Sequence, residues 1–387
     1  MAFDSSPATA RVTRLILQDF RTYAALDLEV DRPVVALVGE NGAGKTNLLE
    51  ALSLFAPGRG LRRADFGDMA RHDGPGSFAV SITLEGAFGE HRLGHGIDRP
   101  DLDGRRSRLL RIDGTPVSSP AAFAEHLRIV WLTPDVDGLF RGPAGDRRRF
   151  LDRLVLAVDA DHGARTAALE RALRSRNRVL EERFEDVLWL DALEREVAEL
   201  GIAVAAARRE TVDRLSALIL AGRNDASPFP FATLALEGEI DRLVATLPAV
   251  DAEDQYRAML REGRARDRAA GRTLAGPQAS DLLVRHGPKD IPAEMASTGE
   301  QKALLIGLVL AHARLVAIMT GLAPLVLLDE VAAHLDPRRR TALFETLAGI
   351  GGQVWMTGAD PALFADLHDR ADVCLVTPGH VSLPDRI

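Results

Sequence analysis

The sequence of 387 residues predicts an α/β fold with a mixed sheet, interrupted by a mostly helical second domain. Short, wholly apolar runs at residues 34–38, 129–132 and 325–328 are typical of parallel strands buried on both faces. Between the second and third runs, the strand pattern gives way to long helical patterns rich in Ala, Leu, Arg and Glu. We therefore expect one discontinuous α/β domain at residues 1–145 and 276–387, and a helical domain at residues 146–275.

Each element follows from a local pattern. Alternation of apolar and polar residues predicts a first pair of strands, and two further strands are expected in a peripheral antiparallel sheet. A glycine-rich loop after the first apolar run predicts the start of a helix. In chain order, the predicted elements are strands at 12–17, 26–30 and 34–38, a helix at 47–55, strands at 78–84, 109–112 and 129–132, helices through 146–223, a loop at 224–231, a short strand pair, and a helix near 253–272.

Composition restricts the class of protein. The longest apolar runs, residues 304–311 and 322–328, are shorter than the ~20 residues that span a bilayer. Residues 1–10 lack the basic-then-apolar pattern of a signal peptide. The single cysteine, Cys374, excludes an intramolecular disulfide and a cysteine-based zinc site. We expect a cytoplasmic protein.

The basic residues are unusual in type, although the net charge of the chain is not. The formal net charge is −8, which excludes nucleic-acid binding through global basicity. Of the 48 basic residues, only Lys45, Lys289 and Lys302 are lysines and the other 45 are arginines. Lys45 and Lys302 lie inside motifs, which indicates positions where a compact ammonium is needed rather than a planar guanidinium.

The first motif is a phosphate-binding loop between a buried strand and a helix. Its glycines let successive backbone N–H groups point at one anion, and the following helix adds its positive end. Lys45 is expected to reach the β- and γ-phosphates of ATP, and the Thr46 hydroxyl to bind Mg²⁺. The residues of the loop are Gly39, Glu40, Asn41, Gly42, Ala43, Gly44, Lys45 and Thr46.

The second motif is the acidic pair Asp329–Glu330, which directly follows the apolar run 325–328. We expect Asp329 to hold Mg²⁺ through water and Glu330 to act as the catalytic base on the attacking water. Asp336, which precedes Pro337, fits a loop at the seam of a dimer.

The third motif separates this chain from most proteins with a phosphate loop. Residues 297–302 read Ser-Thr-Gly-Glu-Gln-Lys and come just before an apolar helix over 303–319. They resemble the signature of ABC-type ATPases, which implies that Ser297, Gly299 and Glu300 face the γ-phosphate held by a second protomer. The same residues also form a helix capping box, and the two interpretations are compatible.

Three further segments resemble the RecF family, bacterial DNA replication, repair and recombination proteins with an SMC-like, ABC-type ATPase head. These are Leu17-x-x-Phe20-Arg21-x-Tyr23, the arginine-bearing residues 58–63, and residues 134–152 with their family-like spacing. The resemblance implies an ATP-dependent homodimeric clamp that binds duplex DNA beside single-stranded gaps. It also implies partnership with RecR and RecO, help in loading RecA onto the gap, and slow hydrolysis as a switch.

The chain departs from the family and ABC patterns at several positions. Residues 278–280 are Gln-Ala-Ser, where the family often carries a His-Arg pair, and Pro143 is displaced by one place. Thr133 stands where transporters place a metal-contacting glutamine, and Thr357 stands at the usual switch histidine. The missing histidine predicts slow hydrolysis.

Two alternative functions remain in view. An ABC transporter ATPase would carry the glutamine and histidine that are missing here. A structural SMC-like linker would carry hundreds of coiled-coil residues, whereas the insertion has about 125 and lacks sustained heptads. Apolar residues at 188, 190, 193, 197 and 200 instead recur at the spacing of a helical-bundle core.

DNA binding by an acidic protein requires local clusters of arginine. The candidates are Arg59, Arg62, Arg63, Arg147, Arg148, Arg174 and Arg178, and the last two belong to a basic stretch with Arg171, Arg176 and Arg183. Such a stretch is either a solvated helix face or a track for the phosphate backbone.

Overall fold

The computed structural model describes residues 7–86, 89–101 and 104–383. The chain divides into two compact units, one of residues 1–137, 226–229 and 305–387, the other of residues 138–225 and 230–304. The expected boundaries were 145/146 and 275/276, so the observed division assigns the signature residues 297–302 to the helical unit. The second boundary lies within a single long helix, α9 (Thr298–Thr320).

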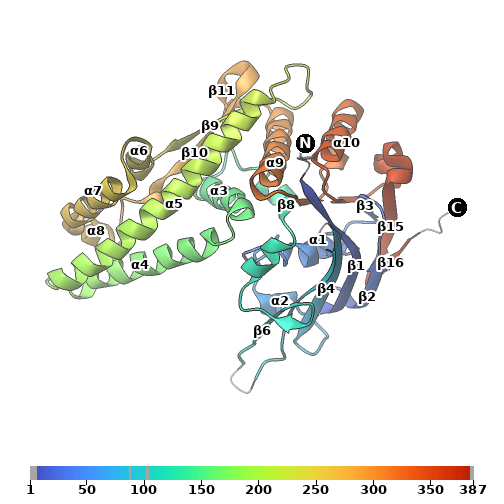
Figure 1. Ribbon diagram of the computed structural model, residues 1–387, viewed down its shortest axis with the longest axis horizontal. Coiled ribbons are helices and arrows are strands. Elements are labelled where there is room, and N and C mark those ends of the chain that lie inside the picture. Colours follow the sequence, from blue (N-terminus) through green and yellow to red (C-terminus); the bar gives the residue numbers. More distant parts are fainter. Residues whose placement is uncertain (1–6, 87–88, 102–103, 384–387) are drawn as a thin grey trace, which may run out of the picture. The chain divides into compact units, whose positions relative to one another are not determined.

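The first unit contains a mostly parallel sheet of six strands in the order β16-β15-β3-β14-β13-β8, in which only β16 is antiparallel to its neighbour. The three predicted apolar runs are strands of this sheet, which joins segments from both ends of the chain (Figure 1). Its strands are β3 (Val34–Val38), β8 (Ile129–Leu132), β13 (Leu325–Leu328), β14 (Val354–Gly358), β15 (Ala371–Thr377) and β16 (His380–Ser382).

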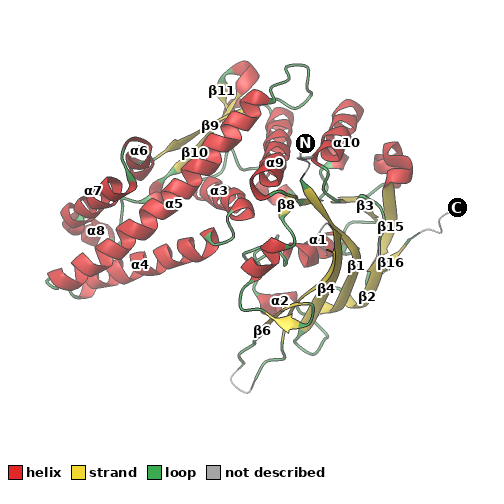
Figure 2. Cartoon of the chain, viewed as in Figure 1, coloured by secondary structure: helices red, strands yellow, loops and turns green. Residues whose placement is uncertain are grey.

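A second, largely antiparallel sheet of seven strands belongs to the same unit (Figure 2). It contains the predicted strand pair and the predicted peripheral strands. Its members are β1 (Ala8–Phe20), β2 (Tyr23–Glu29), β4 (Phe78–Gly86), β5 (Gly89–Ile97), β6 (Arg108–Ile112), β7 (Thr115–Pro116) and β12 (Leu322–Ala323).

The helices of this unit bury apolar faces against the sheets. Leu48, Leu49 and Leu52 of α1 (Lys45–Ser53) share one hydrophobic core with residues of both sheets. The unit also contains α2 (Phe66–Met69) and α10 (Pro337–Ile350). By length and composition, α9 is apolar enough to cross a membrane, but 67% of its most apolar window is buried, as in the core helix of a folded domain.

The second unit is mostly helical, as predicted. The long helices α4 and α5 lie side by side (Figure 1) and share a core that includes Leu169, Val197 and Tyr256. Its helices are α3 (Ala144–Val158), α4 (His162–Glu182), α5 (Val187–Ala221), α6 (Glu239–Thr246), α7 (Ala249–Glu262) and α8 (Arg264–Ala270).

Two sequence predictions for this unit were wrong. The expected strand pair after residue 231 is one strand, β9 (Ala232–Glu237), followed by α6. The partner of β9 is β10 (Asp281–His286), which also pairs with β11 (Ile291–Pro292). Leu188, assigned to the bundle core, is 85% exposed, whereas Leu190 and Val197 of the same helix are buried.

Candidate nucleotide site

Four parallel strands end at the same edge of the sheet, and this register assembles the candidate site. Val38 is level with Gly358, and Leu328 is level with both Met356 and Leu132. The phosphate loop follows β3, the acidic pair follows β13, and Thr357 lies at the end of β14. Residues nearly 300 positions apart in sequence therefore meet at one edge, where ligands bind in open α/β sheets.

The backbone of the phosphate loop requires a glycine at position 44. Gly44 has a φ of 107°, and a Cβ at this position would lie 2.9 Å from both the Thr22 hydroxyl and the Tyr23 hydroxyl. The ammonium of Lys45 donates to the carbonyl oxygens of Gly39 (2.6 Å) and Glu40 (2.8 Å). Lys45 is thus folded over its own loop, where its charge is available to a phosphate group.

The turn after β1 holds the phosphate-loop helix in place, which gives the Phe-Arg-x-Tyr motif a physical role. Arg21, with a φ of 53°, makes a two-pronged ion pair with Glu50 of α1 at 2.8 and 2.6 Å. Tyr23 donates its hydroxyl to the Gly44 carbonyl at 3.2 Å. The carboxylate of Glu50 is fully buried, and breaking a buried ion pair by removing one partner is strongly destabilising.

Asp329 lies between two threonines. Thr46 donates to both of its carboxylate oxygens (3.0 and 3.1 Å), and Thr357 donates to Oδ1 (2.8 Å). Burial raises the pKa of Asp329 above its ordinary value, while the two hydroxyl donors act in the opposite direction. From the sequence, Thr357 was identified only as the position of the missing switch histidine. The hydrogen bond between Thr357 and Asp329 depends on the register of β13 and β14, which the sequence does not show.

Glu330 is the next residue and has a left-handed backbone, with a φ of 54°. Its amide donates to the Thr357 hydroxyl at 2.8 Å. A non-glycine residue in this region of φ/ψ is strained, and such strain is often found at functional sites. Asp336 accepts a hydrogen bond from the Arg339 amide (3.0 Å) and thereby caps α10.

The residues at this edge fit a magnesium ion by the chemistry of their donors. The Thr46 hydroxyl and the Asp329 carboxylate are oxygen ligands of the kind that Mg²⁺ prefers, and they are in direct contact. In the described parts of the chain there is no group of three or more His, Cys, Asp or Glu suited to a metal. At a site with these two ligands, phosphate oxygens and water would complete the coordination of Mg²⁺, as in nucleotide sites.

The signature residues form the predicted capping box in the second unit. Glu300 accepts hydrogen bonds from the Ser297 amide (3.1 Å) and hydroxyl (3.0 Å), and the Glu300 amide contacts the Ser297 hydroxyl at 3.4 Å. Gly299 has open space where a Cβ would be, so the start of α9 is unobstructed at this point. Thr133, at the place of a metal-contacting glutamine, instead hydrogen-bonds Asp135.

The arginines of residues 58–63 differ in their availability for DNA. Arg62 binds the buried Glu50 (2.9 Å) and Asn47 (2.8 Å), so it is part of the support of α1. Arg59 pairs with Asp65 at 3.2 Å, with both side chains well exposed. Arg63 has a φ of 54°.

Arg147 and Arg148, at the start of α3, are held by the first residue of β10 and by the residue before it. Arg147 forms two hydrogen bonds with Asp281 (2.8 and 2.7 Å), and Arg148 donates to the Ser280 carbonyl at 2.7 Å. In the segment that departs from the family pattern, Gln278 donates to the carbonyls of Thr273 and Ala275. These side chains therefore stabilise the second unit internally.

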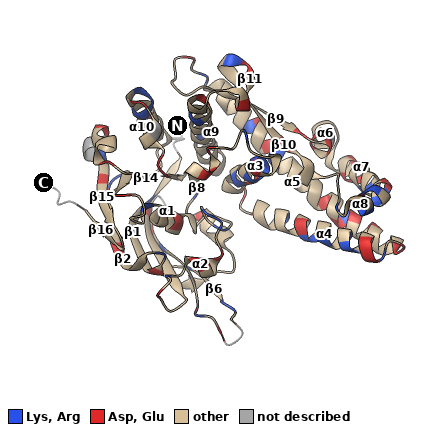
Figure 3. Ribbon diagram, turned by 180° about the vertical axis from the view of Figure 1, so that it is seen from behind, with Lys and Arg blue, Asp and Glu red and all other residues tan. Residues whose placement is uncertain are grey.

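The basic stretch of α4 is not one continuous face. Arg176 is fully buried and bound to Glu194 and Asp267, so including it in an exposed basic stretch, whether a solvated face or a phosphate track, was wrong. Arg174 and Arg178 are exposed, and Arg174 lies 3.8 Å from Glu170. In Figure 3, basic and acidic segments both occur along α4.

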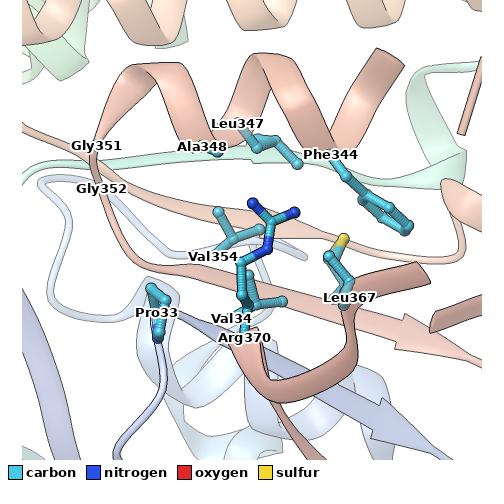
Figure 4. A pocket seen from close by; sticks show the side chains of 11 residues that line it. Pro33, Val34, Phe344, Leu347, Ala348, Gly351, Gly352, Val354, Leu367 and Arg370 are labelled. Atoms are coloured by element: carbon cyan, nitrogen blue, oxygen red, sulfur yellow. The ribbon is translucent and has the colours of Figure 1, made fainter. Parts of the chain in front are cut away.

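A cavity of about 170 Å³ lies at the opposite edge of the parallel sheet, where β3 and β14 begin (Figure 4). It is lined by apolar side chains that include Val34, Phe344 and Leu347, with Arg370 pointing into it. It contains none of the predicted site residues and is separate from the candidate nucleotide site.

The chain is similar to known proteins over nearly its whole length. A family model described as the RecF/RecN/SMC N-terminal domain matches residues 11–379. The DNA replication and repair protein RecF of Rhizobium meliloti (strain 1021) is 55% identical over 376 residues, covering 97% of this chain and 100% of the relative. The protein of the same name from Mesorhizobium japonicum is 52% identical and covers 97% and 98%.

Solved structures show the same fold. The recombination mediator protein RecF-ATPrS in the RecFOR pathway superposes with a TM-score of 0.83 at 20% identity, covering 98% of this chain and 99% of that one. The Smc head domain of Pyrococcus furiosus bound to the C-terminal domain of ScpA gives a TM-score of 0.52 at 17% identity, covering 97% and 96%. The predicted ABC-type head fold and the predicted family are confirmed: the chain belongs to the RecF family.

Proposed function

We propose that the chain is an ATP-dependent DNA-binding clamp of recombinational DNA repair that uses slow ATP hydrolysis as a switch. The observation that carries the proposal is the convergence of Lys45, Thr46, Asp329 and Glu330 at one edge of the parallel sheet. The family relatives are DNA replication and repair proteins by name, and their match over the whole chain disfavours a transporter ATPase.

The roles of the site residues follow from their positions. The phosphate loop, residues 39–46, would hold the phosphates through its backbone N–H groups and Lys45. Thr46 and Asp329 would hold Mg²⁺, which when bound supplies positive charge to the β- and γ-phosphates. Glu330 would accept a proton from the attacking water.

The signature residues Ser297, Gly299 and Glu300 would complete the nucleotide site of a second protomer, so that ATP closes a homodimer. The start of α9 supports this because helix N-termini favour anions. On the family's pattern the closed dimer would bind duplex DNA beside single-stranded gaps. It would act with RecR and RecO and help load RecA; the related RecF–ATPrS structure is itself assigned to the RecFOR pathway.

The test is size analysis by light scattering, with and without Mg·ATP and a gapped DNA duplex. The wild-type protein should dimerise with ATP and retain the gapped duplex. Lys45→Ala should lose ATP binding and therefore both responses. Ser297→Arg should still bind ATP as a monomer but fail to dimerise, because a long side chain obstructs the signature. A dimer of Ser297→Arg that still forms with ATP would refute the composite site.

A further inference from the structure

Lys289 contacts the signature although it belongs to no motif identified in the sequence. It ends the short turn Gly287–Lys289 between β10 and β11, and its side chain is half exposed. Its ammonium lies 2.6 Å from Oε1 of Glu300. It is one of three lysines among 48 basic residues.

The carboxylate of Glu300 is fully engaged. Oε1 binds Lys289, and Oε2 accepts from the amide and the hydroxyl of Ser297. Lys289 first, and then Ser297, lower the pKa of Glu300 to about 2. Glu300 is therefore a negative charge at the N-terminus of α9 throughout the neutral range.

This arrangement conflicts with phosphate binding unless the charge is balanced. Ser297 has one hydroxyl proton, which it now donates to Glu300, and it must release Glu300 to donate to a phosphate oxygen. The released carboxylate then lies beside a dianionic phosphate group, and like charges at such short range repel. When the Ser297 hydroxyl turns away, the Ser297 amide and Lys289 still hold Glu300, and of these two only Lys289 carries a charge that balances the carboxylate.

We infer that Lys289 is a positioning residue that neutralises Glu300 and so keeps the signature receptive to the γ-phosphate of a second protomer. The inference rests on the proposed composite nucleotide site. It assigns Lys289 no direct contact with the nucleotide. The ammonium acts by fixing the Glu300 carboxylate and compensating its charge.

A plain surface ion pair is the competing interpretation, and it makes a different prediction. Exposed pairs contribute little to stability, so both interpretations expect Lys289→Met to fold normally. Only the inferred role makes ATP-driven dimerisation depend on Lys289, and only while residue 300 carries a charge. The decisive experiment is therefore a double-mutant cycle of Lys289→Met with Glu300→Gln.

The readout is the ATP concentration that gives half-maximal dimerisation. Lys289→Met should raise this concentration about tenfold. Lys289→Arg should keep this concentration close to that of the wild type, because arginine retains the positive charge. In the Glu300→Gln background, Lys289→Met should have no further effect. Arg285→Ala is the matched control, because Arg285 lies in β10, just before the turn that contains Lys289, and binds Asp290 instead of the signature.

Three results would overturn the inference. A Lys289→Met protein with the wild-type midpoint would show that the pair is only a surface contact, and the composite site would stand. If Lys289→Met raised the ATP concentration for half-maximal dimerisation equally in the wild-type and Glu300→Gln backgrounds, Lys289 would have a structural role instead. If wild-type protein binds ATP in calorimetry but never dimerises, the composite site itself fails, and the inference fails with it.

Discussion

The hydroxyl of Thr357 donates a hydrogen bond to Oδ1 of Asp329 and accepts one from the amide of Glu330, and both bonds are 2.8 Å long. Thr357 is fully buried, so one side chain at the end of β14 holds both acids that follow the neighbouring strand β13. Thr357 thus connects the fold of the sheet to the chemistry proposed for its edge.

Thr357→Val should retain ATP binding but lower turnover about tenfold, because Asp329 and Glu330 lose the hydroxyl that orients them. The valine is similar in shape but leaves the Glu330 amide without its acceptor, so the free energy of unfolding should fall by about 1–3 kcal/mol. Denaturant unfolding and steady-state hydrolysis measure the two effects. Thr357→Ser should restore both, and wild-type turnover in Thr357→Val would exclude a positioning role.

Asp329→Asn should stabilise the nucleotide-free protein by about 1 kcal/mol at pH 7.5. Burial raises the pKa of Asp329, so the folded state favours the protonated carboxyl. The associated stability is present at low pH and is lost as the pH rises through the raised pKa. The difference between variant and wild type should therefore shrink as the pH is lowered towards 4.

Mg·ATP provides the control for this prediction. Only the carboxylate can hold the metal well, so ligand binding should stabilise the wild type more than Asp329→Asn and reverse their order. Thermal unfolding with and without Mg·ATP measures this. If the variant is less stable than the wild type without ligand at pH 7.5, burial of the ionised Asp329 carboxylate does not destabilise the folded protein.

Glu330→Gln should retain ATP affinity and lower turnover about a hundredfold, which is the usual loss when a general base is removed. Asp329 remains to serve the metal, so the ATP-bound dimer should accumulate. Calorimetry with ATP, hydrolysis assays and size analysis separate binding, chemistry and dimer lifetime. Hydrolysis at the wild-type rate would show that another group accepts the proton.

Much of the site was predictable because its residues follow local patterns. The phosphate loop and the acidic pair each come after a short apolar run, and a buried parallel strand is the simplest structure for such a run. The order of strands in the sheet was not predictable in the same way. The pairing of β14 between β3 and β13 is a contact between distant segments, and it alone gives Thr357 its role.

The helical unit shows where sequence patterns fail. Arg176 looks like its exposed neighbours Arg174 and Arg178, but it is buried because Glu194 and Asp267 compensate its charge from two other helices. Leu188 fits a helical apolar stripe but lies in the first turn of α5, where it is exposed. Periodicity identifies one face of a helix, whereas tertiary packing decides which part of that face is covered.

Arg62→Ala should lower the free energy of unfolding by about 1.5–3 kcal/mol, because the fully buried Glu50 loses a charged hydrogen-bond donor and, among the described residues, keeps Arg21 as its ionic partner. Denaturant unfolding measures the loss. Arg59→Ala is the matched control, since its pair with Asp65 is exposed and contributes little. Equal stabilities of the two variants would show that Arg62 does not support α1.

The last prediction concerns the exposed arginines of α4. Arg62 is unsuitable for testing DNA binding by charge reversal, because a glutamate there would place a second carboxylate against Glu50. Weaker DNA binding could then result from unfolding. Arg174 and Arg178 are exposed on one helix, so their reversal leaves the buried Arg176 network intact. If they contact phosphates, Arg174→Glu with Arg178→Glu should weaken duplex binding for every sequence, since phosphate contacts carry no sequence information.

The salt dependence is the decisive measurement for this pair. Each lost phosphate contact lowers the slope of log affinity against log salt by about 0.9, so two lost contacts should lower it by about 1.8. Thermal stability should not change, because both side chains are exposed, and ATP binding should not change, because neither residue belongs to the candidate nucleotide site. Arg209→Glu with Arg214→Glu on α5 is the control, as Arg214 is exposed, Arg209 is half-buried, and both pair with acids one turn away. An unchanged slope in the α4 variant would show that these arginines only solvate the helix.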